Sequence, residues 1–185
     1  MASAGVVSDV SQTLVLRLKE GVPLVAGNVD LLIADDFDTY NKKPAVTVFL
    51  YHVAINGELR NGPAKLFSDG TMSPPGLPIE LRYLLTPWAA TPDDTHKILG
   101  QILQSLSAFA SMSRPQLEGT SWEADDTVQL LPESLPVDEY HDIWDPSEIP
   151  YKLSISYMAR VFNLDSPKKD AFAPVQTAQF VGPPP

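Results

Sequence analysis

The sequence contains no cysteine and few basic residues, and each deficit excludes a class of function. Without cysteine there are no disulfides, no thiolate catalysis and no cysteine-ligated zinc or iron–sulfur site. There are 13 Lys and Arg residues against 23 Asp and Glu, a net charge of −10. Phosphate backbones repel such a chain, so nucleic acid is a poor candidate partner. The same charge keeps a protein soluble and favours a basic protein partner.

Long apolar runs are also missing. No stretch approaches the ~20 apolar residues that span a bilayer, so membrane insertion is not expected. Residues 1–7 contain neither the basic segment nor the long apolar segment of a secretory signal. We therefore expect a protein that is made and folded in the cytoplasm.

Recognisable catalytic motifs are absent as well. There is no G-x-S-x-G elbow, no G-x-x-x-x-G-K-[ST] phosphate loop and no G-x-G-x-x-G after a strand. His52, His96 and His141 are not spaced to bind a metal from one helix or strand. His52 lies inside a strand pattern and is expected to be a hydrogen-bonded structural residue, whereas His96 is expected on the surface.

A cluster of carboxylates at Asp35, Asp36 and Asp38 has the chemistry to bind a hard cation such as calcium. However, it lacks the alternating D-x-D-x-D-G pattern of a calcium loop, so a solvated loop is the better interpretation. The sequence thus predicts no catalytic residue, no metal site and no cofactor. An enzyme with dispersed carboxylates stays an alternative, because the absence of motifs does not exclude one.

Apolar periodicity predicts an α+β fold with a mixed, mainly antiparallel sheet of about five strands, packed with two main helices. The chain length fits one domain, which we expect at residues 1–165. The predicted helices span residues 8–20 and 91–115, with a short helix at 137–144. The first has an apolar stripe of Val10, Leu14 and Leu18, and the second a stripe of Ile98, Ile102, Leu106 and Phe109. The predicted strands span residues 29–33, 44–53, 79–85, 127–131 and 152–161.

Capping residues and alternation support these boundaries. Ser8 or Asp9 is expected to cap the first helix, and Thr91 the second. We expect Pro115 to end the second helix. In the last strand, apolar residues from Leu153 to Val161 alternate with polar ones, which predicts one buried face and one exposed face.

Two segments stand out as candidates for contacts with other proteins. Residues 56–78 are rich in Gly, Pro, Asn and Ser and are typical of a long loop or a protruding hairpin. Residues 166–185 are rich in proline and are expected to form an extended C-terminal arm. Large apolar side chains in such segments often anchor contacts, although those of tryptophans can equally cover the core. The predicted partner-binding residues are Leu66, Phe67, Met72, Trp122, Phe172 and Phe180.

Five segments, in order and at compatible spacing, resemble the cap or tail terminator family of extracellular contractile injection systems. This family was formerly catalogued as a domain of unknown function, and its particles are relatives of contractile phage tails. The similar segments are Ser8–Leu14, Pro44–Val53, Leu81–Trp88, His96–Gly100 and Tyr151–Tyr157. No single motif is diagnostic, but five in order make the resemblance specific, and it extends over about residues 8–180.

The resemblance implies a structural role and brings no catalytic residues. It implies a hexameric ring on the end of the inner tube and the last layer of the contractile sheath, which ends polymerisation and fixes particle length. Sheath and tube proteins would then be the partners, in a phage tail-like particle that is released from the cell in some systems. The alternative is an assembly chaperone or adaptor that binds sheath or tube protein and leaves the finished particle.

Overall fold

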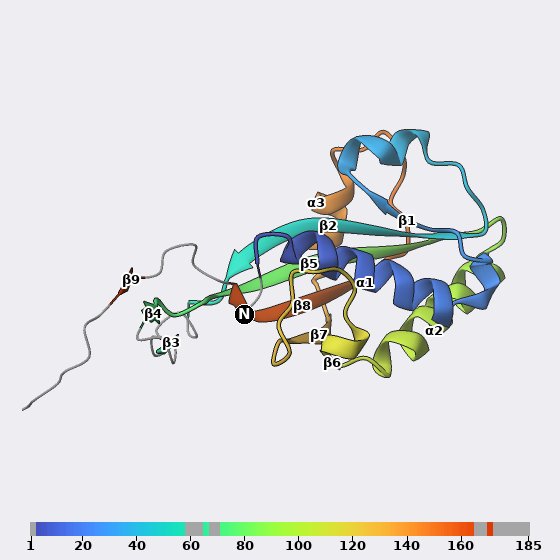
Figure 1. Ribbon diagram of the computed structural model, residues 1–185. Coiled ribbons are helices and arrows are strands. Elements are labelled where there is room, and N and C mark those ends of the chain that lie inside the picture. The colour runs from blue at the N-terminus through green and yellow to red at the C-terminus, as the bar shows by residue number, and fades with distance from the viewer. Residues whose placement is uncertain (1–2, 58–64, 67–70, 165–169, 172–185) are drawn as a thin grey trace, which may run out of the picture.

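The computed structural model describes residues 3–57, 65–66, 71–164 and 170–171 (Figure 1). The α-helices are α1 (Val6–Gly21), α2 (Pro92–Ser107) and α3 (Val137–Trp144). Short 3-10 helices are η1 (Pro23–Val25), η2 (Ala34–Thr39) and η3 (Arg114–Gln116). The strands are β1 (Val29–Leu32), β2 (Ala45–Ile55), β3 (Lys65–Leu66), β4 (Thr71–Ser73), β5 (Leu77–Trp88), β6 (Ser111–Ser113), β7 (Thr127–Glu133), β8 (Ile155–Leu164) and β9 (Asp170–Ala171).

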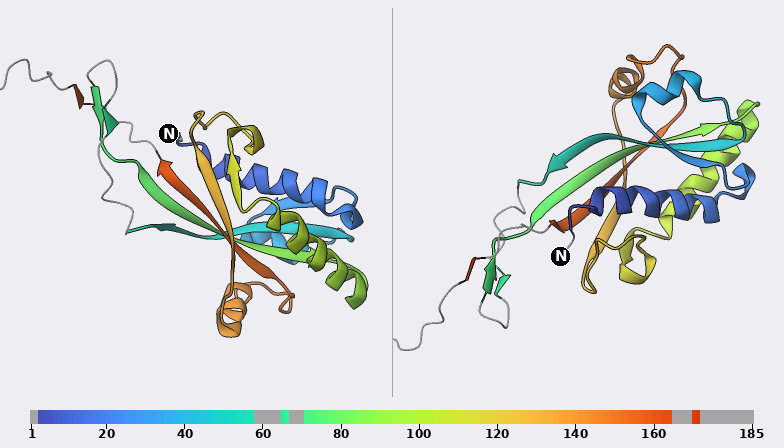
Figure 2. Two further views of the ribbon diagram at one scale, coloured as in Figure 1. Left: turned by 90° about the horizontal axis from the view of Figure 1, so that it is seen from below. Right: turned by 45° about the horizontal axis from the view of Figure 1, so that its top comes forward.

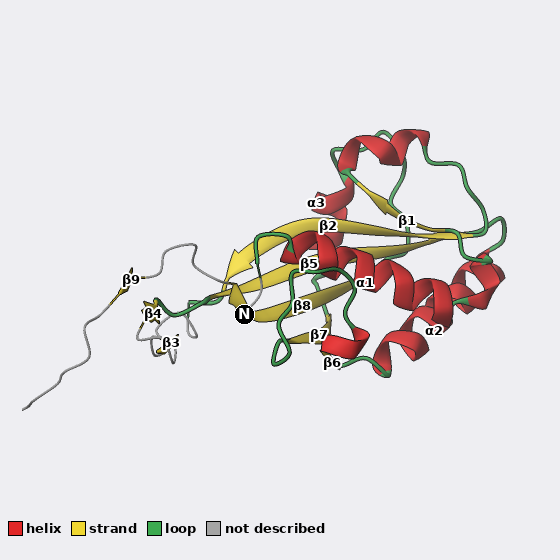
Figure 3. Cartoon of the chain, in the orientation of Figure 1, coloured by secondary structure: helices red, strands yellow, loops and turns green. Residues whose placement is uncertain are grey.

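The main sheet has six strands in the order β1-β2-β5-β8-β7-β6. Only β1 and β2 are parallel, and the other pairs are antiparallel, which confirms the predicted mixed, mainly antiparallel sheet. The short edge strand β6 was not predicted, because three residues are too few for a visible alternation. A second, three-stranded sheet has the order β3-β4-β9 and lies beyond one end of the main sheet (Figure 3).

Helices α1 and α2 cover one face of the main sheet (Figure 2). The predicted stripe of α1 is confirmed, since Val10, Leu14 and Leu18 are fully buried. The predicted caps are wrong: α1 begins at Val6, and Ser8 lies inside the helix. Because the helix begins before Ser8 and Asp9, their side chains do not cap its N-terminus, and Asp9 instead accepts a hydrogen bond from the backbone N–H of Ser121.

The boundaries of α2 are partly as predicted. Thr91 is the N-cap, and its hydroxyl accepts a hydrogen bond from the backbone N–H of Asp94 at 3.1 Å. The helix ends at Ser107, so the predicted end at Pro115 is wrong. The chain turns earlier because the carbonyl of Ala110 accepts a hydrogen bond from Leu130 of β7 at 2.9 Å, which brings the next residues into the sheet as β6.

The opposite face of the sheet is covered by η2 and α3 (Figure 2). Its apolar cluster is separate from the larger core under α1 and α2. The buried members of this second cluster are Phe37, Ala45, Leu84, Trp88 and Trp144. Strands β2 and β5 are therefore covered on both faces over part of their length, as expected for central strands.

This second layer corrects the prediction for the last strand. β8 begins at Ile155, and Leu153 before it is 40% exposed. Ser156, which the alternation placed outside, is fully buried beneath α3. Its hydroxyl shares a hydrogen bond with Tyr51 Oη at 2.9 Å and donates to Glu133 Oε2 at 3.2 Å. These partners satisfy the buried hydroxyl, so burial of a serine costs little here.

Candidate assembly surfaces

Strand β2 is longer than its parallel neighbour β1 and leaves part of the main sheet with an uncovered edge. The pairing of β1 with β2 ends at Leu32 and Phe49. Beyond this point β2 pairs only with β5 among the strands that the structure describes, up to Ile55 opposite Ile79. The register shifts between Leu50 and His52, where β2 carries a bulge.

Backbone groups along this part of β2 point away from β5. The N–H of Asn56 donates to the carbonyl of Pro78 at 3.0 Å. Because bonded and non-bonded residues alternate in an antiparallel pair, Val53 and Ile55 direct their backbone N–H and C=O groups to the outer side. Their side chains are 51% and 55% exposed. An apolar edge with unpaired backbone groups is a template for pairing with another chain.

The edge formed by β1 is protected by charge instead. The carboxylate of Asp30 accepts hydrogen bonds from Tyr40 Oη at 2.8 Å and from Lys42 Nζ at 2.9 Å. Burial raises the pKa of Asp30, but the hydrogen bonds from Lys42 and Tyr40 outweigh burial and hold it below its usual range. Burial, and then the bond to Asp30, raise the pKa of Tyr40 above its usual value. A charged side chain on an edge strand discourages the addition of another strand.

The small sheet contains two of the predicted partner-binding residues. Leu66 of β3 and Met72 of β4 are directly opposite each other in an antiparallel pair. Thr71 and Met72 also pair with β9. The antiparallel pairing of β3 with β4 agrees with the hairpin alternative predicted for residues 56–78. Strands β2 and β5 lead from the helix-covered part of the main sheet toward this small sheet (Figure 1). Phe67, Phe172 and Phe180 lie outside the described residues.

Trp122 is not a surface residue. It is 6% exposed and belongs to the core under α1 and α2. Its indole N–H donates to the backbone carbonyl of Glu118 at 2.6 Å. Trp122 therefore covers the core, which was the alternative considered for it, and it offers little surface to a partner. Trp144, 3% exposed, does the same on the opposite face.

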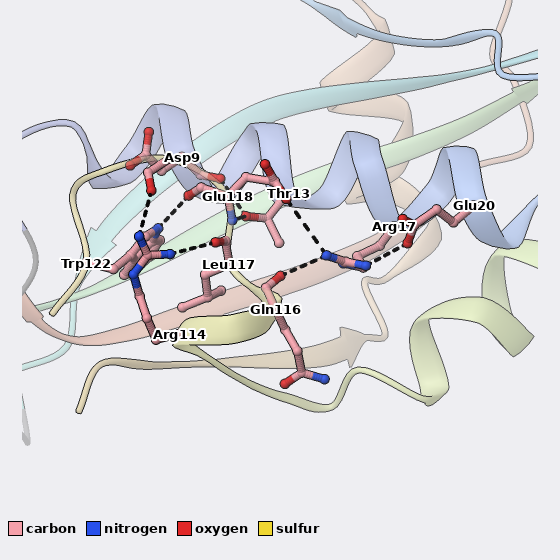
Figure 4. Close-up of polar contacts among 10 residues, drawn as sticks. Asp9, Thr13, Arg17, Glu20, Arg114, Gln116, Leu117, Glu118 and Trp122 are labelled. Atoms are coloured by element: carbon pink, nitrogen blue, oxygen red, sulfur yellow. Dashed lines mark hydrogen bonds and ion pairs between the residues drawn. The ribbon is translucent and has the colours of Figure 1, made fainter. Parts of the chain in front are cut away.

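The loop that carries Trp122 is held against α1 by hydrogen bonds (Figure 4). The backbone N–H of Glu118 donates to Thr13 Oγ1 at 2.9 Å. The backbone N–H of Ser121 donates to Asp9 Oδ2 at 2.9 Å. Arg17 donates from Nη2 to the carbonyl of Gln116 at 3.2 Å. These contacts explain why polar residues occur on the buried side of α1, and they have a structural role.

Groups with catalytic or metal-binding chemistry are scattered in this fold. His52 and His96 are both exposed, so the prediction of a structural imidazole at His52 is wrong, because it lies where β2 is no longer covered. Asp36 accepts a hydrogen bond from the backbone N–H of Ile33 at 3.1 Å within η2. Over the described ranges, no three His, Asp or Glu residues are grouped so that they could hold a metal ion. None of the described helices is long and apolar enough to cross a membrane.

Known proteins share this fold. A sheath/tube terminator of an extracellular contractile injection system (PVC, extended state, cryo-EM) has a TM-score of 0.66 and 20% identity, covering 96% of this chain and 63% of that chain. The cap of the anti-feeding prophage (AFP tube terminating cap) has a TM-score of 0.57 and 18% identity, covering 86% and 58%. The chain thus spans less than two thirds of the length of either structure. No curated protein sequence matches it.

The sequence family described as the Pvc16 N-terminal domain matches residues 9–178. This range includes both described sheets with the open part of β2, helices α2 and α3, and all but the first three residues of α1. The family is in keeping with the resemblance of the five sequence segments, and the two solved structures share the fold. The chain belongs to the Pvc16 N-terminal domain family.

Proposed function

We propose that this protein is a structural subunit of the cap, or tail terminator, of a contractile injection system. It binds the end of the tube and sheath, stops further polymerisation and fixes the length of the particle. The observation that carries this proposal is the family match over residues 9–178, combined with a fold shared with a sheath/tube terminator over 96% of the chain. The subunit acts by binding, without catalysis.

In the proposed cap the subunits form a hexameric ring. A six-fold ring requires a heterologous interface, in which one patch of a subunit meets a different patch of its neighbour. The open edge of β2 supports this arrangement, because Val53 and Ile55 combine exposed apolar side chains with outward backbone groups. Strand addition at such an edge provides main-chain hydrogen bonds in a defined register.

The remaining contacts are assigned to residues 56–78 and to the C-terminal arm. Residues 1–165 form the domain, and residues 166–185 act as an arm that contacts a neighbouring subunit or the sheath. Residues 56–78, including Leu66, Phe67 and Met72, contact the tube or an adjacent subunit. Assembly takes place in the cytoplasm, and the subunit then remains in the particle.

Electron microscopy of particles made with and without this protein tests the proposal. Particles that lack it should have uncapped ends and irregular lengths. Unchanged ends and lengths would refute a terminator role. Binding to free sheath or tube protein, together with absence from purified particles, would instead support an assembly chaperone.

Substitutions separate the contributions of the two surfaces. Val53→Lys with Ile55→Lys places charges on the open edge, and we expect a folded protein that no longer caps particles. Leu103→Lys is the control for a lysine at an exposed apolar position away from the edge, because Leu103 is 41% exposed and lies on α2. The single variants Val53→Lys and Ile55→Lys match it in added charge. Deleting residues 166–185 should abolish capping while the domain still folds, and normal capping would exclude the arm from this role.

A further inference from the structure

A pocket of about 270 Å³ opens on the sheet face opposite α1 and α2. Its lining residues come from η2, the middle of β2, and α3 with the turn that follows it. Figure 2 shows η2 and α3 on this face of the sheet. Its aromatic lining consists of Phe37, Phe49, Tyr51 and Trp144, and its carboxylates are Asp35, Asp38 and Asp142. The residues described above for assembly are not part of it.

The aromatic lining is held by packing. The Phe37 ring meets Phe49 edge to face, with ring centroids 5.2 Å apart, and lies 4.9 Å from Trp144. Phe37 and Trp144 are 4% and 3% exposed, so these rings are fixed by the second apolar cluster. The indole N–H of Trp144 is buried and has no hydrogen-bond acceptor among the described residues. The NMR resonance of this N–H is therefore a local reporter of binding in the pocket.

Negative charge is concentrated around this lining. Residues 34–39 and 137–149 contain eight of the 23 carboxylates of the chain and none of its 13 Lys and Arg residues. The two segments are joined where Asp38 Oδ1 accepts a hydrogen bond from the backbone N–H of Glu148 at 2.9 Å. The carboxylates of Asp35 in η2 and Asp142 in α3 form neither a hydrogen bond nor an ion pair with another described residue. Their charges are therefore available to a ligand.

We propose that this pocket binds an arginine side chain presented by a partner protein. A planar guanidinium stacks on aromatic faces and donates several hydrogen bonds to carboxylates, so it matches both features of the pocket. A lysine ammonium is more strongly hydrated and has no planar face, so it fits the same lining less well. The chemistry of the pocket does not depend on the proposed function. Only the source of the arginine rests on it, and this source is a neighbouring protein of the particle.

The experiment uses short peptides and the full chain. NMR spectra of the isotope-labelled protein are recorded while acetyl-Gly-Arg-Gly-amide is added, and then with the same peptide containing citrulline, which keeps the shape but lacks the charge. The Trp144 indole N–H resonance is followed. The double variant Asp35→Asn/Asp142→Asn removes the two free carboxylates. Asp138→Asn/Glu139→Gln is the control, because it changes the net charge equally on α3 outside the pocket.

We expect a saturable shift of the Trp144 resonance with the arginine peptide. The affinity should fall at least about tenfold with citrulline or in the Asp35→Asn/Asp142→Asn variant, and it should be unchanged in the control. Equal shifts with both peptides, equal weakening in both double variants, or no saturation up to about 50 mM peptide would overturn the proposal. The titration needs no particles, so its failure is distinct from a failure of the cap function.

Discussion

Arg160 donates two hydrogen bonds to a single carboxylate oxygen of Glu80, from Nε at 3.1 Å and from Nη2 at 2.8 Å. The two residues are directly opposite on β8 and β5. Asn56 donates to the same oxygen at 2.8 Å. Burial raises the pKa of Glu80, but the hydrogen bonds from Asn56 and Arg160 and the nearby arginine charges outweigh it and place the pKa below its usual range.

The substitution Glu80→Gln should lower the free energy of unfolding by about 1–2 kcal/mol at neutral pH, because the amide oxygen of glutamine accepts the hydrogen bonds of Arg160 without a negative charge. A depressed carboxylate pKa stabilises the folded state above the unfolded pKa of about 4.3, and this contribution is lost as the pH falls through the folded pKa. The difference in unfolding free energy between the unsubstituted protein and Glu80→Gln, measured with urea, should therefore decrease in acid. Glu148→Gln, at an exposed carboxylate, is the control. A difference that is constant down to about pH 2 would contradict the assignment.

Two glycines with positive φ allow backbone strain to be separated from close packing. Gly27 has φ +83° with open space around a Cβ, whereas a Cβ at Gly119, φ +87°, would lie 2.1 Å from Asp9 Cγ. We expect Gly27→Ala to cost about 1–2 kcal/mol of unfolding free energy through backbone strain alone. Gly119→Ala should cost about 1–3 kcal/mol more, because Asp9 must move and release the buried N–H of Ser121.

Thermal unfolding of both variants measures this difference. In an Asp9→Ala background the additional cost of Gly119→Ala should disappear, since the side chain that blocks the new methyl group is gone. Equal costs for the two glycines would contradict the predicted clash with Asp9. An additional cost of Gly119→Ala that persists without Asp9 would mean that another neighbour opposes the new methyl group.

Local patterns in the sequence predicted most of the main sheet and its helices. The Ile98, Ile102 and Leu106 stripe is buried as its spacing required, and α3 has the predicted bounds. In β5 the alternating residues Ile79, Leu81, Tyr83 and Leu85 all belong to the core under the helices. These elements have short-range signals, a period or a cap, that do not depend on distant partners.

Features that depend on distant partners were not predictable. The burial of Ser156 requires α3 to fold over the opposite face, and single-strand alternation contains no information about that layer. The open edge of β2 exists because β1 is shorter, which is a relationship between two strands. The same holds for the pocket, because its carboxylates come from segments about 100 residues apart in the chain. The sequence alone predicted only a solvated loop at Asp35 and Asp38.

The N-cap of α2 provides a test of a feature that the sequence did predict. Thr91→Ala removes the hydroxyl that accepts from the backbone N–H of Asp94 and should reduce the unfolding free energy by about 1 kcal/mol. Thr91→Ser keeps the hydroxyl and should retain most of the stability. If both variants lose the same amount in urea unfolding, the methyl group and not the cap is responsible.

A buried hydroxyl pair connects α1 to the centre of the sheet. Tyr83 Oη and Ser11 Oγ are 2.9 Å apart, and both residues are buried. Ser11 also donates to the carbonyl of Val7 at 2.9 Å. Tyr83→Phe should therefore cost only about 1 kcal/mol of unfolding free energy, because Ser11 keeps a partner.

Alkaline pH should favour the Tyr83→Phe variant relative to the protein with Tyr83. Burial raises the pKa of Tyr83, although the hydrogen bond to Ser11 partly offsets this. A raised pKa gives a stability contribution that is complete below the unfolded pKa of about 10 and is lost as the pH rises toward the folded pKa. Urea unfolding near pH 11 should therefore reduce or reverse the deficit of Tyr83→Phe measured at pH 7. A deficit that is unchanged at both values would mean that Tyr83 is free to ionise in the folded chain.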